Sequence, residues 1–225
     1  MIDLLGGQVV HARFGDRAHY RPIRSKLCDS ARIEDVVPAL LDLFAFRRLY
    51  IADLDALLGR RRQLAAIATV RRMAPGLSLW IDAAIRDSQD LATVAEHGTA
   101  VLASETLTAA AVERLLGACP TAVLSIDTQG DRLLGEAALL ERRQSWPAHV
   151  IAMNLAHVGS NLGPDLKQLN ALRPLALRSR IYAAGGVRDA SDLRQCREAG
   201  AAGALIASAL HDGRITHADL EKHRG

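Results

Sequence analysis

The chain alternates between two kinds of hydrophobic pattern. Short runs rich in Val, Ile, Leu and Ala, typical of strands buried on both faces, are separated by longer segments with apolar residues at helical spacing. Because a helical segment follows each run, consecutive strands are expected to pair in parallel under a cover of helices. The predicted strands begin at Ile2, Leu49, Leu77, Ala100, Ala122, Val150, Ile181 and Ala204.

Polar residues and glycines mark where helices begin and end. Asp87 and Asp189 stand at N-cap positions, and Gly98 and Gly200 end the segments that follow them. The predicted helices are Ile33–Phe46, Gln63–Met73, Ser88–His97, Ala109–Leu116, Glu136–Gln144, Leu166–Leu172 and Ala190–Ala199.

An internal repeat divides the chain into two similar halves. The segment 85–91 reads IRDSQDL and 187–193 reads VRDASDL, and each copy runs on to an Ala-Ser pair. Eight strands in two four-strand halves favour a closed TIM (βα)₈ barrel over an open doubly wound sheet. We therefore expect one α/β domain over residues 1–225, with half-barrels at about 1–120 and 121–225.

Composition excludes several functional classes. The residues are 49% hydrophobic but only 4% aromatic, so an aliphatic core is expected, and the net charge of +3 comes from scattered arginines interleaved with carboxylates. No nucleic-acid surface and no membrane span are expected. The histidines and three cysteines lack metal-ligand spacing, and neither a P-loop nor a secretory segment occurs. We expect a cytoplasmic protein without metal or cofactor.

Two aspartates are candidates for acid–base catalysis. Asp3 and Asp127 are predicted at the ends of the first and fifth strands, which face each other across an eight-stranded barrel. One ionised and one protonated carboxyl group on either side of a ligand can act as general base and general acid. The alternative is that each aspartate only caps the loop that follows it.

Small residues after the last strands indicate a phosphate site. Loops after the seventh and eighth strands of such barrels frequently hold phosphate on backbone N–H groups, and glycine allows close approach. A Gly-Gly pair alone can equally serve as a simple turn. The predicted phosphate-binding residues are Gly185, Gly186, Ala207 and Ser208, with Gly159 and Ser160 after the sixth strand.

The corresponding loop of the first half is expected not to hold a second phosphate. There Asp82 introduces a carboxylate and is followed by two alanines, and Glu105 adds charge beyond Ser104. Asp82 is expected either to bind a hydroxyl or cationic group of the substrate or to cap its loop. Ser104 and Asp53 are further candidates on the substrate side, and Asp53 could instead be a cap.

The polar segment from Gly15 to Lys26 follows the first strand. It could form a lid that brings Arg17 and Tyr20 to an anionic substrate, or it could be a solvated loop. Lys26 is a poor candidate for a Schiff base, because such lysines usually rise from a buried strand.

The ordered motifs resemble the HisA/HisF family of histidine-biosynthesis barrels, the isomerase and the cyclase-synthase subunit. The resemblance covers essentially the whole chain and includes the stretches 2–4, 52–55, 125–128, 163–164 and 184–216. It places Asp3 and Asp127 on the family's acid–base pair. It also places Gly185, Gly186, Ala207 and Ser208 on the phosphate loops of the second half.

Several departures separate the chain from the family's isomerase, ProFAR isomerase. The glycine-rich loop for one of its two phosphates is Asp82-Ala83-Ala84 here, and Val158 replaces a carboxylate after the sixth strand. The sequence also begins close to Asp3, as though the first strand were trimmed. These features resemble a diverged group found in methanogens and methylotrophs, which implies a role linked to one-carbon metabolism.

Three hypotheses follow. The first is an isomerase-type or lyase enzyme that acts on a small monophosphorylated metabolite through Asp3 and Asp127. The second is ProFAR isomerase itself, which performs an Amadori rearrangement. The third is a catalytically silent barrel that serves as a binding partner. A homo-oligomer is compatible with each of them.

Overall fold

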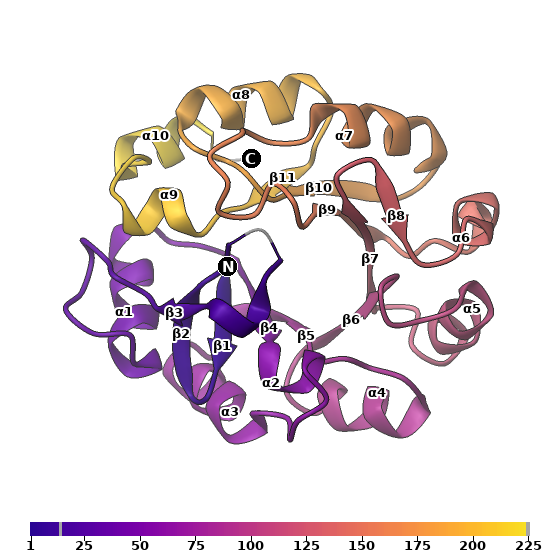
Figure 1. Ribbon diagram of the computed structural model, residues 1–225, viewed down its shortest axis with the longest axis horizontal. Coiled ribbons are helices and arrows are strands. Elements are labelled where there is room, and N and C mark those ends of the chain that lie inside the picture. Colours follow the sequence, from indigo (N-terminus) through magenta and orange to yellow (C-terminus); the bar gives the residue numbers. More distant parts are fainter. Residues whose placement is uncertain (14, 224–225) are drawn as a thin grey trace.

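Parallel strands form the inner ring of the molecule, viewed down the ring in Figure 1. The computed structural model describes residues 1–13 and 15–223. From β1 round to β11, each strand pairs in parallel with the next, which agrees with the predicted TIM barrel. In this order the strands are β1 (Ile2–Leu5), β4 (Arg48–Asp53), β5 (Ser78–Asp82), β6 (Thr99–Ala103), β7 (Val123–Gln129), β9 (His149–Asn154), β10 (Arg180–Ala184) and β11 (Gly203–Leu205).

The helices cover the outside of this ring. The strand starts agree with the predicted ones to within one residue. One predicted helix is wrong in length, because the segment 136–144 contains only the single turn α6 and part of the 3₁₀ turn η2. The helices are α1 (Ile33–Leu43), α2 (Leu54–Leu57), α3 (Leu64–Met73), α4 (Ser88–Ala95), α5 (Ala109–Ala118), α6 (Ala138–Glu141), α7 (Leu166–Leu172), α8 (Ala190–Glu198), α9 (Ser208–His211) and α10 (His217–Lys222), with 3₁₀ turns η1 (Arg17–His19), η2 (Arg143–Ser145) and η3 (Arg173–Leu175).

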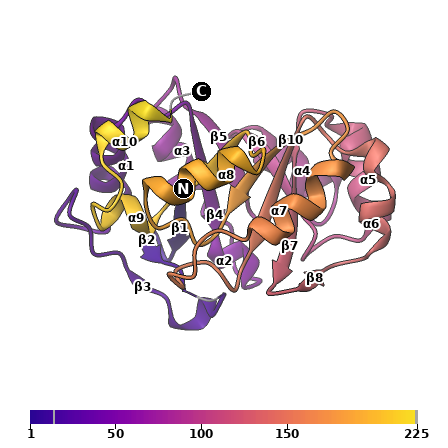
Figure 2. The same ribbon diagram turned by 90° about the horizontal axis from the view of Figure 1, so that it is seen from above.

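Two antiparallel hairpins extend the ring at equivalent positions of the two halves, and the hydrophobic pattern did not predict them. In the first half β1 turns into β2 (Gln8–His11), which also pairs with β3 (Arg21–Pro22). In the second half β7 turns into β8 (Arg132–Leu134). In side view, β3 and β8 project from the same end of the barrel as α2, which directly follows β4 (Figure 2). The hairpins therefore rise at the carboxyl ends of the strands.

The hairpins change where the two candidate aspartates lie. Asp3 is paired with Val10 on β2, and Asp127 is paired with Leu134 on β8. Both aspartates are thus inside continuous strands and not at strand ends as predicted. The first hairpin turns at Gly6 and Gly7, whose φ angles of 56° and 80° fit a two-residue turn that requires positive φ at both positions.

The ring closes between β11 and β1 through hydrogen bonds outside the strand ladder. The backbone nitrogen of Met1 donates to the carbonyl oxygen of Ile206 over 2.7 Å. Nearby, the backbone N–H of Lys26 donates to the carbonyl oxygen of His211 over 2.7 Å. We call this region the seam, since residues from both ends of the chain meet there.

Two apolar layers stabilise the barrel. The larger lies between strands and helices and contains buried aliphatic side chains such as Ile51, Leu102 and Leu124. The smaller fills the inside of the ring, where Trp80 packs edge-on against Tyr182 with ring centroids 4.9 Å apart. Trp80 is therefore a packing residue of the barrel interior.

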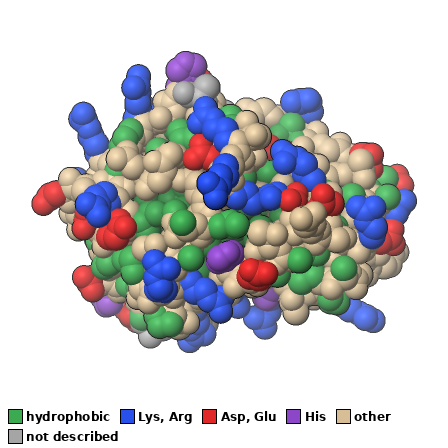
Figure 3. All heavy atoms as spheres, turned by 90° about the horizontal axis from the view of Figure 1, so that it is seen from below, with side chains coloured by type: hydrophobic (Ala, Val, Ile, Leu, Met, Phe, Trp, Pro, Cys, Tyr) green, Lys and Arg blue, Asp and Glu red, His purple; other side chains and the backbone are tan. Residues whose placement is uncertain are grey.

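The surface carries both signs of charge. On the face that includes α3 and α4, basic side chains gather near the middle of the view with acidic side chains beside them (Figure 3). Among residues 1–13 and 15–223, none of the helices is long and apolar enough to cross a membrane.

The N-caps of the repeated helices provide a test of the fold. Asp87 accepts hydrogen bonds from the backbone N–H groups of Gln89 and Asp90, and Asp189 binds Ser191 and Asp192 in the same way. We expect Asp87→Ala and Asp189→Ala each to lower the free energy of unfolding by about 1 kcal/mol, because two N–H groups lose their acceptor. Urea unfolding measures the change. The matched Asp→Asn variants should retain most of the stability, because asparagine can also accept these hydrogen bonds. If Asp→Asn lost as much stability as Asp→Ala at both positions, the capping role would be contradicted.

Candidate active site

Two adjoining pockets open at the carboxyl ends of the strands. The carboxyl pocket, about 420 Å³, is lined by four acidic side chains, Asp3, Asp82, Glu105 and Asp127, together with Arg17 and two tyrosines. The loop pocket, about 540 Å³, is lined by the loops after β9, β10 and β11. Met1, Asp3, Ala12 and Val158 line both pockets. A single small molecule could therefore occupy both.

Asp127 is held in a fixed orientation by neighbouring donors. Its Oδ1 accepts a hydrogen bond from Ser125 Oγ at 2.5 Å, and its Oδ2 accepts bonds from Ser104 Oγ and from the Glu105 backbone N–H, both at 3.2 Å. Burial raises the pKa of Asp127 to about 6, and the charge of Glu105 adds to this while the donors oppose it. The carboxyl group is therefore oriented and close to its titration point near neutral pH.

Asp3 faces the same pocket from the opposite side of the ring, since β1 and β7 are four strands apart in the pairing order. No residue in the described part of the chain donates a hydrogen bond to its carboxyl group, which is nearly fully buried. Burial raises the pKa of Asp3 to about 6, and the positive charges of the Met1 ammonium and of Arg17 oppose the shift. The environments thus shift both aspartates of the pair to about the same pKa, which leaves the division into acid and base to the bound substrate.

Asp82 is a third buried carboxyl group in the pocket. Tyr50 Oη donates to its Oδ2 over 3.0 Å, so Tyr50 orients this group as well as packing inside the barrel. Its Oδ1 is buried and has no hydrogen-bond partner among the residues described. Burial and the negative charges of Asp127 and Glu105 raise the pKa of Asp82 to about 7. The simple capping role for Asp82 is wrong, because none of its hydrogen bonds caps a loop.

The segment between β2 and β3 covers the carboxyl pocket. Arg17, in η1, reaches across to Glu105 on the loop after β6, and their charged groups are 2.5 Å apart. Tyr20 also lines the pocket, and burial raises its pKa to about 12. In Figure 1 this segment lies over the ring. The contact supports the lid interpretation of this segment over that of a solvated loop.

The loop pocket brings together most of the residues predicted to bind phosphate. Gly159, Gly185, Gly186, Ala207 and Ser208 all line it. Ser208 Oγ forms a 2.9 Å hydrogen bond with Nε2 of His11, which comes from β2 and was not recognised in the sequence. Only the three-dimensional closure of the seam brings these two residues together, so no local motif indicates the pair.

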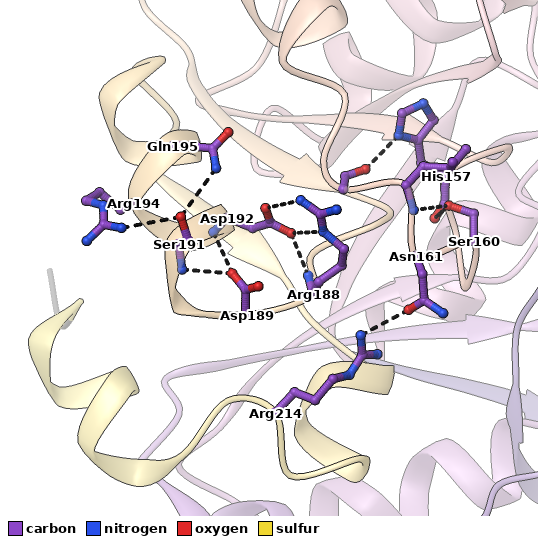
Figure 4. Close-up of polar contacts among 12 residues, drawn as sticks. His157, Ser160, Asn161, Arg188, Asp189, Ser191, Asp192, Arg194, Gln195 and Arg214 are labelled. Carbon is purple, nitrogen blue, oxygen red and sulfur yellow. Dashed lines mark hydrogen bonds and ion pairs between the residues drawn. The ribbon is translucent and has the colours of Figure 1, made fainter.

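Two further polar residues of the loop pocket were also missed. Arg214 donates from Nη1 to Asn161 Oδ1 over 3.0 Å and is paired with Asp212 over 2.8 Å. Figure 4 shows Arg214 pointing from the loop before α10 towards Asn161, which lies close to His157 and Ser160 on the neighbouring loop. Since Arg214 lines the pocket, it adds a positive charge beside the glycine loops.

The glycines in these loops are also required by close backbone packing. A Cβ atom on Gly186 would lie 2.0 Å from the carbonyl oxygen of Gly163, and one on Gly159 would lie 2.2 Å from that of Ala12. Both glycines have positive φ angles. The sequence argument weighed phosphate binding against a simple turn for the Gly-Gly pair, and the structure adds that these glycines allow the loops to pack against each other.

Three predicted contact residues lie outside both pockets and are corrected. Asp53 is fully buried and accepts hydrogen bonds from the backbone N–H groups of Ala56 and Gln63, so it is a cap. Ser104 is buried and donates to Asp127, so it can act only by positioning that residue. Ser160 donates to the carbonyl oxygen of His157 and lines neither pocket.

An arginine donates hydrogen bonds to the backbone carbonyl oxygens of the first-half loop. Arg62 donates from Nε to the carbonyl oxygen of Ala83 over 2.9 Å and from Nη2 to that of Ala84 over 3.1 Å. Its guanidinium is also 2.7 Å from Asp90. In the second half the equivalent aspartate, Asp192, is instead paired with Arg188 (Figure 4). The equivalent loops of the two halves are therefore held by different contacts.

Comparisons with known proteins agree with the geometry. The family model described as histidine biosynthesis protein matches residues 1–216. An uncharacterized protein of Methanocaldococcus jannaschii is 27% identical over 99% of this chain and 95% of its own length. A protein of Xylella fastidiosa, 26% identical over 99% of this chain and 88% of its own, is named 1-(5-phosphoribosyl)-5-((5-phosphoribosylamino)methylideneamino) imidazole-4-carboxamide isomerase, or ProFAR isomerase. A protein of Anaeromyxobacter dehalogenans with the same name is 29% identical over 97% of this chain and 94% of its own.

The raised pKa of Asp82 leads to a prediction about stability. Burial disfavours its ionised form in the folded state, so folding becomes less favourable as the pH rises from about 4 towards 7. We expect Asp82→Asn to be more stable than the wild type at pH 8, by on the order of 1 kcal/mol or more, because one pKa unit corresponds to about 1.4 kcal/mol. Urea unfolding at pH 8 and pH 4.5 measures the difference.

The advantage of Asp82→Asn should shrink at pH 4.5, where the wild-type carboxyl group is protonated in the folded protein. Asp131→Asn, which removes an exposed carboxylate paired with Lys167, is the matched control and should change stability little at either pH. If Asp82→Asn were less stable than the wild type at pH 8, the prediction would be wrong. The surroundings would then stabilise the ionised carboxyl group of Asp82 in the folded protein.

Proposed function

The chain belongs to the histidine biosynthesis protein family, and from this premise we propose that it is an enzyme that isomerises a small monophosphorylated substrate by acid–base chemistry. Asp3 and Asp127 are the catalytic pair in this proposal. The observation that carries it is the position of the two buried carboxyl groups, which face one pocket from opposite strands and adjoin a second pocket lined by glycine loops.

The titration of the pair suits proton transfer at neutral pH. General acid–base groups are most effective when their pKa lies close to the working pH, and burial moves both aspartates towards it. One carboxylate would remove a proton from a carbon beside a C=O or C=N group, while the other carboxyl group protonates the oxygen or nitrogen. The first aspartate, now protonated, would then give its proton to the neighbouring carbon, while the second, now ionised, takes the proton of the hydroxyl or amino group on the first carbon. This completes the isomerisation and returns both aspartates to their starting states.

The loop pocket supports a single phosphoryl group as the anchor. Gly185 and Gly186 allow close approach to backbone N–H groups, and Ser208 and His11 can donate hydrogen bonds. Arg214 adds a positive charge. The substrate phosphate would then lie beside Asp3, which lines both pockets, and its reactive carbon would lie in the carboxyl pocket.

A second candidate is the reaction named in the relatives, that of ProFAR isomerase. Shared family membership and these names favour it. Against it, Asp82, Ala83 and Ala84 stand where the second half has its glycine loop, and Arg62 binds the carbonyl groups of that loop. A ligand with a phosphate at each end would bring its second charge towards Asp82, so we rank this candidate second.

Solvent-deuterium exchange tests the proposed chemistry. A thermal-shift screen of phosphorylated sugars and other phosphate monoesters identifies a ligand, and NMR in D₂O then follows deuterium incorporation beside its carbonyl group. We expect Asp3→Asn and Asp127→Asn each to slow this exchange by about 100-fold or more while the protein stays folded and still binds the ligand. Asp131→Asn should exchange at the wild-type rate. Undiminished exchange in either active-site variant would rule out the paired mechanism.

Complementation separates the two candidates. We expect the chain, well expressed in a histidine auxotroph that lacks ProFAR isomerase, not to restore growth, because its first-half loop does not favour a second phosphate. Growth that depends on Asp3 and Asp127 would instead establish the second candidate and overturn the monophosphate proposal.

A further inference from the structure

The carboxyl pocket contains more negative than positive groups. Its lining side chains include four carboxyl groups, Asp3, Asp82, Glu105 and Asp127, and one guanidinium, that of Arg17. Arg17 is already committed to Glu105 through the 2.5 Å ion pair. Met1 also lines the pocket, and its ammonium group opposes the pKa shift of Asp3. Asp82 and Asp127 are buried in the same pocket without an ion pair in the described part of the chain, which is costly in a site shielded from water.

The available donors satisfy these groups unequally. Asp127 has three donors, supplied by Ser125, Ser104 and the Glu105 backbone. Asp82 has one donor, Tyr50, on Oδ2, and its Oδ1 has no partner in the described part of the chain. A buried acceptor without a donor is uncommon in native proteins and calls for an explanation. A hydrogen-bond donor inside the pocket would supply the missing partner of Asp82 Oδ1.

The proposed reaction does not need Asp82. Proton transfer between Asp3 and Asp127 uses the two strands that face each other across the ring, whereas Asp82 lies at the end of β5. The negative charges of Asp127 and Glu105 are among the causes that raise the pKa of Asp82, since like charges oppose one another. Its presence is best accounted for by a ligand whose charge offsets it.

We propose that Asp82 binds a protonated amine of the substrate, so that the substrate class is a small phosphate monoester carrying an ammonium group. The inference rests on the proposed function for the phosphoryl anchor and adds the second recognition group. The ammonium donates to Oδ1 of Asp82 and offsets the charge of the pocket, and the phosphoryl group lies against Gly185, Gly186 and Ser208.

An ammonium fits this position better than a neutral hydroxyl group. A hydroxyl could donate one hydrogen bond to Oδ1, but it would leave the excess negative charge unchanged. An ammonium supplies a charge-assisted hydrogen bond, about twice as strong as a neutral one, and also lowers the repulsion among Asp3, Asp82 and Asp127. The shared wall formed by Asp3, Ala12 and Val158 allows one molecule to place its two ends in the two pockets.

Titration calorimetry at pH 8 with matched ligands tests this assignment. The probes are ω-aminoalkyl phosphates with chains of two to five carbons, the ω-hydroxyalkyl phosphates of the same lengths, and inorganic phosphate. We expect the best amine-terminated compound to bind wild-type protein about tenfold or more tightly than its hydroxyl counterpart. Asp82→Asn should remove this preference, so that each amine binds no more tightly than its hydroxyl counterpart.

Controls make each outcome decisive. Asp131→Asn removes an exposed carboxylate and should keep the preference for the amine. Equal binding of amine and hydroxyl compounds overturns the inference, as does an amine preference that survives in Asp82→Asn, and so does failure of every amine to bind more tightly than inorganic phosphate. The unphosphorylated amino alcohols form a separate arm. If they bind as tightly as the aminoalkyl phosphates, with the same loss in Asp82→Asn, Asp82 recognises amines while the phosphoryl anchor of the proposed function fails.

Discussion

The burial of three carboxyl groups in one pocket is the constraint on which this site depends. Asp3, Asp82 and Asp127 are each nearly inaccessible to water at the mouth of the barrel, and burial is the largest cause of each raised pKa. In water these groups would be ionised and chemically passive near neutral pH. Enclosed by the lid segment and by apolar side chains, they can exchange protons in that range. The same desolvation lowers the stability of the fold, so the site is obtained at the expense of stability.

Much of the fold could be predicted from the sequence because its determinants are local. Continuous apolar runs mark where the strands begin to within one residue, and Asp87 and Asp189 cap the helices that the repeat predicts. The hairpins were missed because β2 and β8 are short, at four and three residues, and carry few apolar positions. Their turns also place Asp3 and Asp127 inside strands, which strand propensity alone does not reveal.

The site itself was predictable only in part. Residue type and position in the repeat indicated Asp3, Asp127 and the glycine loops, but they could not separate a ligand contact from a structural one. In the sequence Asp53 and Ser104 resemble site residues. In the structure each side chain is buried, and its hydrogen bonds are to other residues of the protein. Arg62 and His11 gave no signal, because their partners lie 21 and 197 positions away along the chain. Only the folded geometry identifies them.

The hydrogen bond between His11 and Ser208 has a mechanical consequence. His11 comes from the first hairpin and Ser208 from the start of α9, so this contact bridges the seam where the ring of strands meets its own beginning. A ligand bound to both residues would act as a cross-link between β11 and β1, which are joined by hydrogen bonds outside the strand ladder. Ligand binding and closure of the barrel would then be coupled. In the unliganded protein, local opening would begin between β11 and β1.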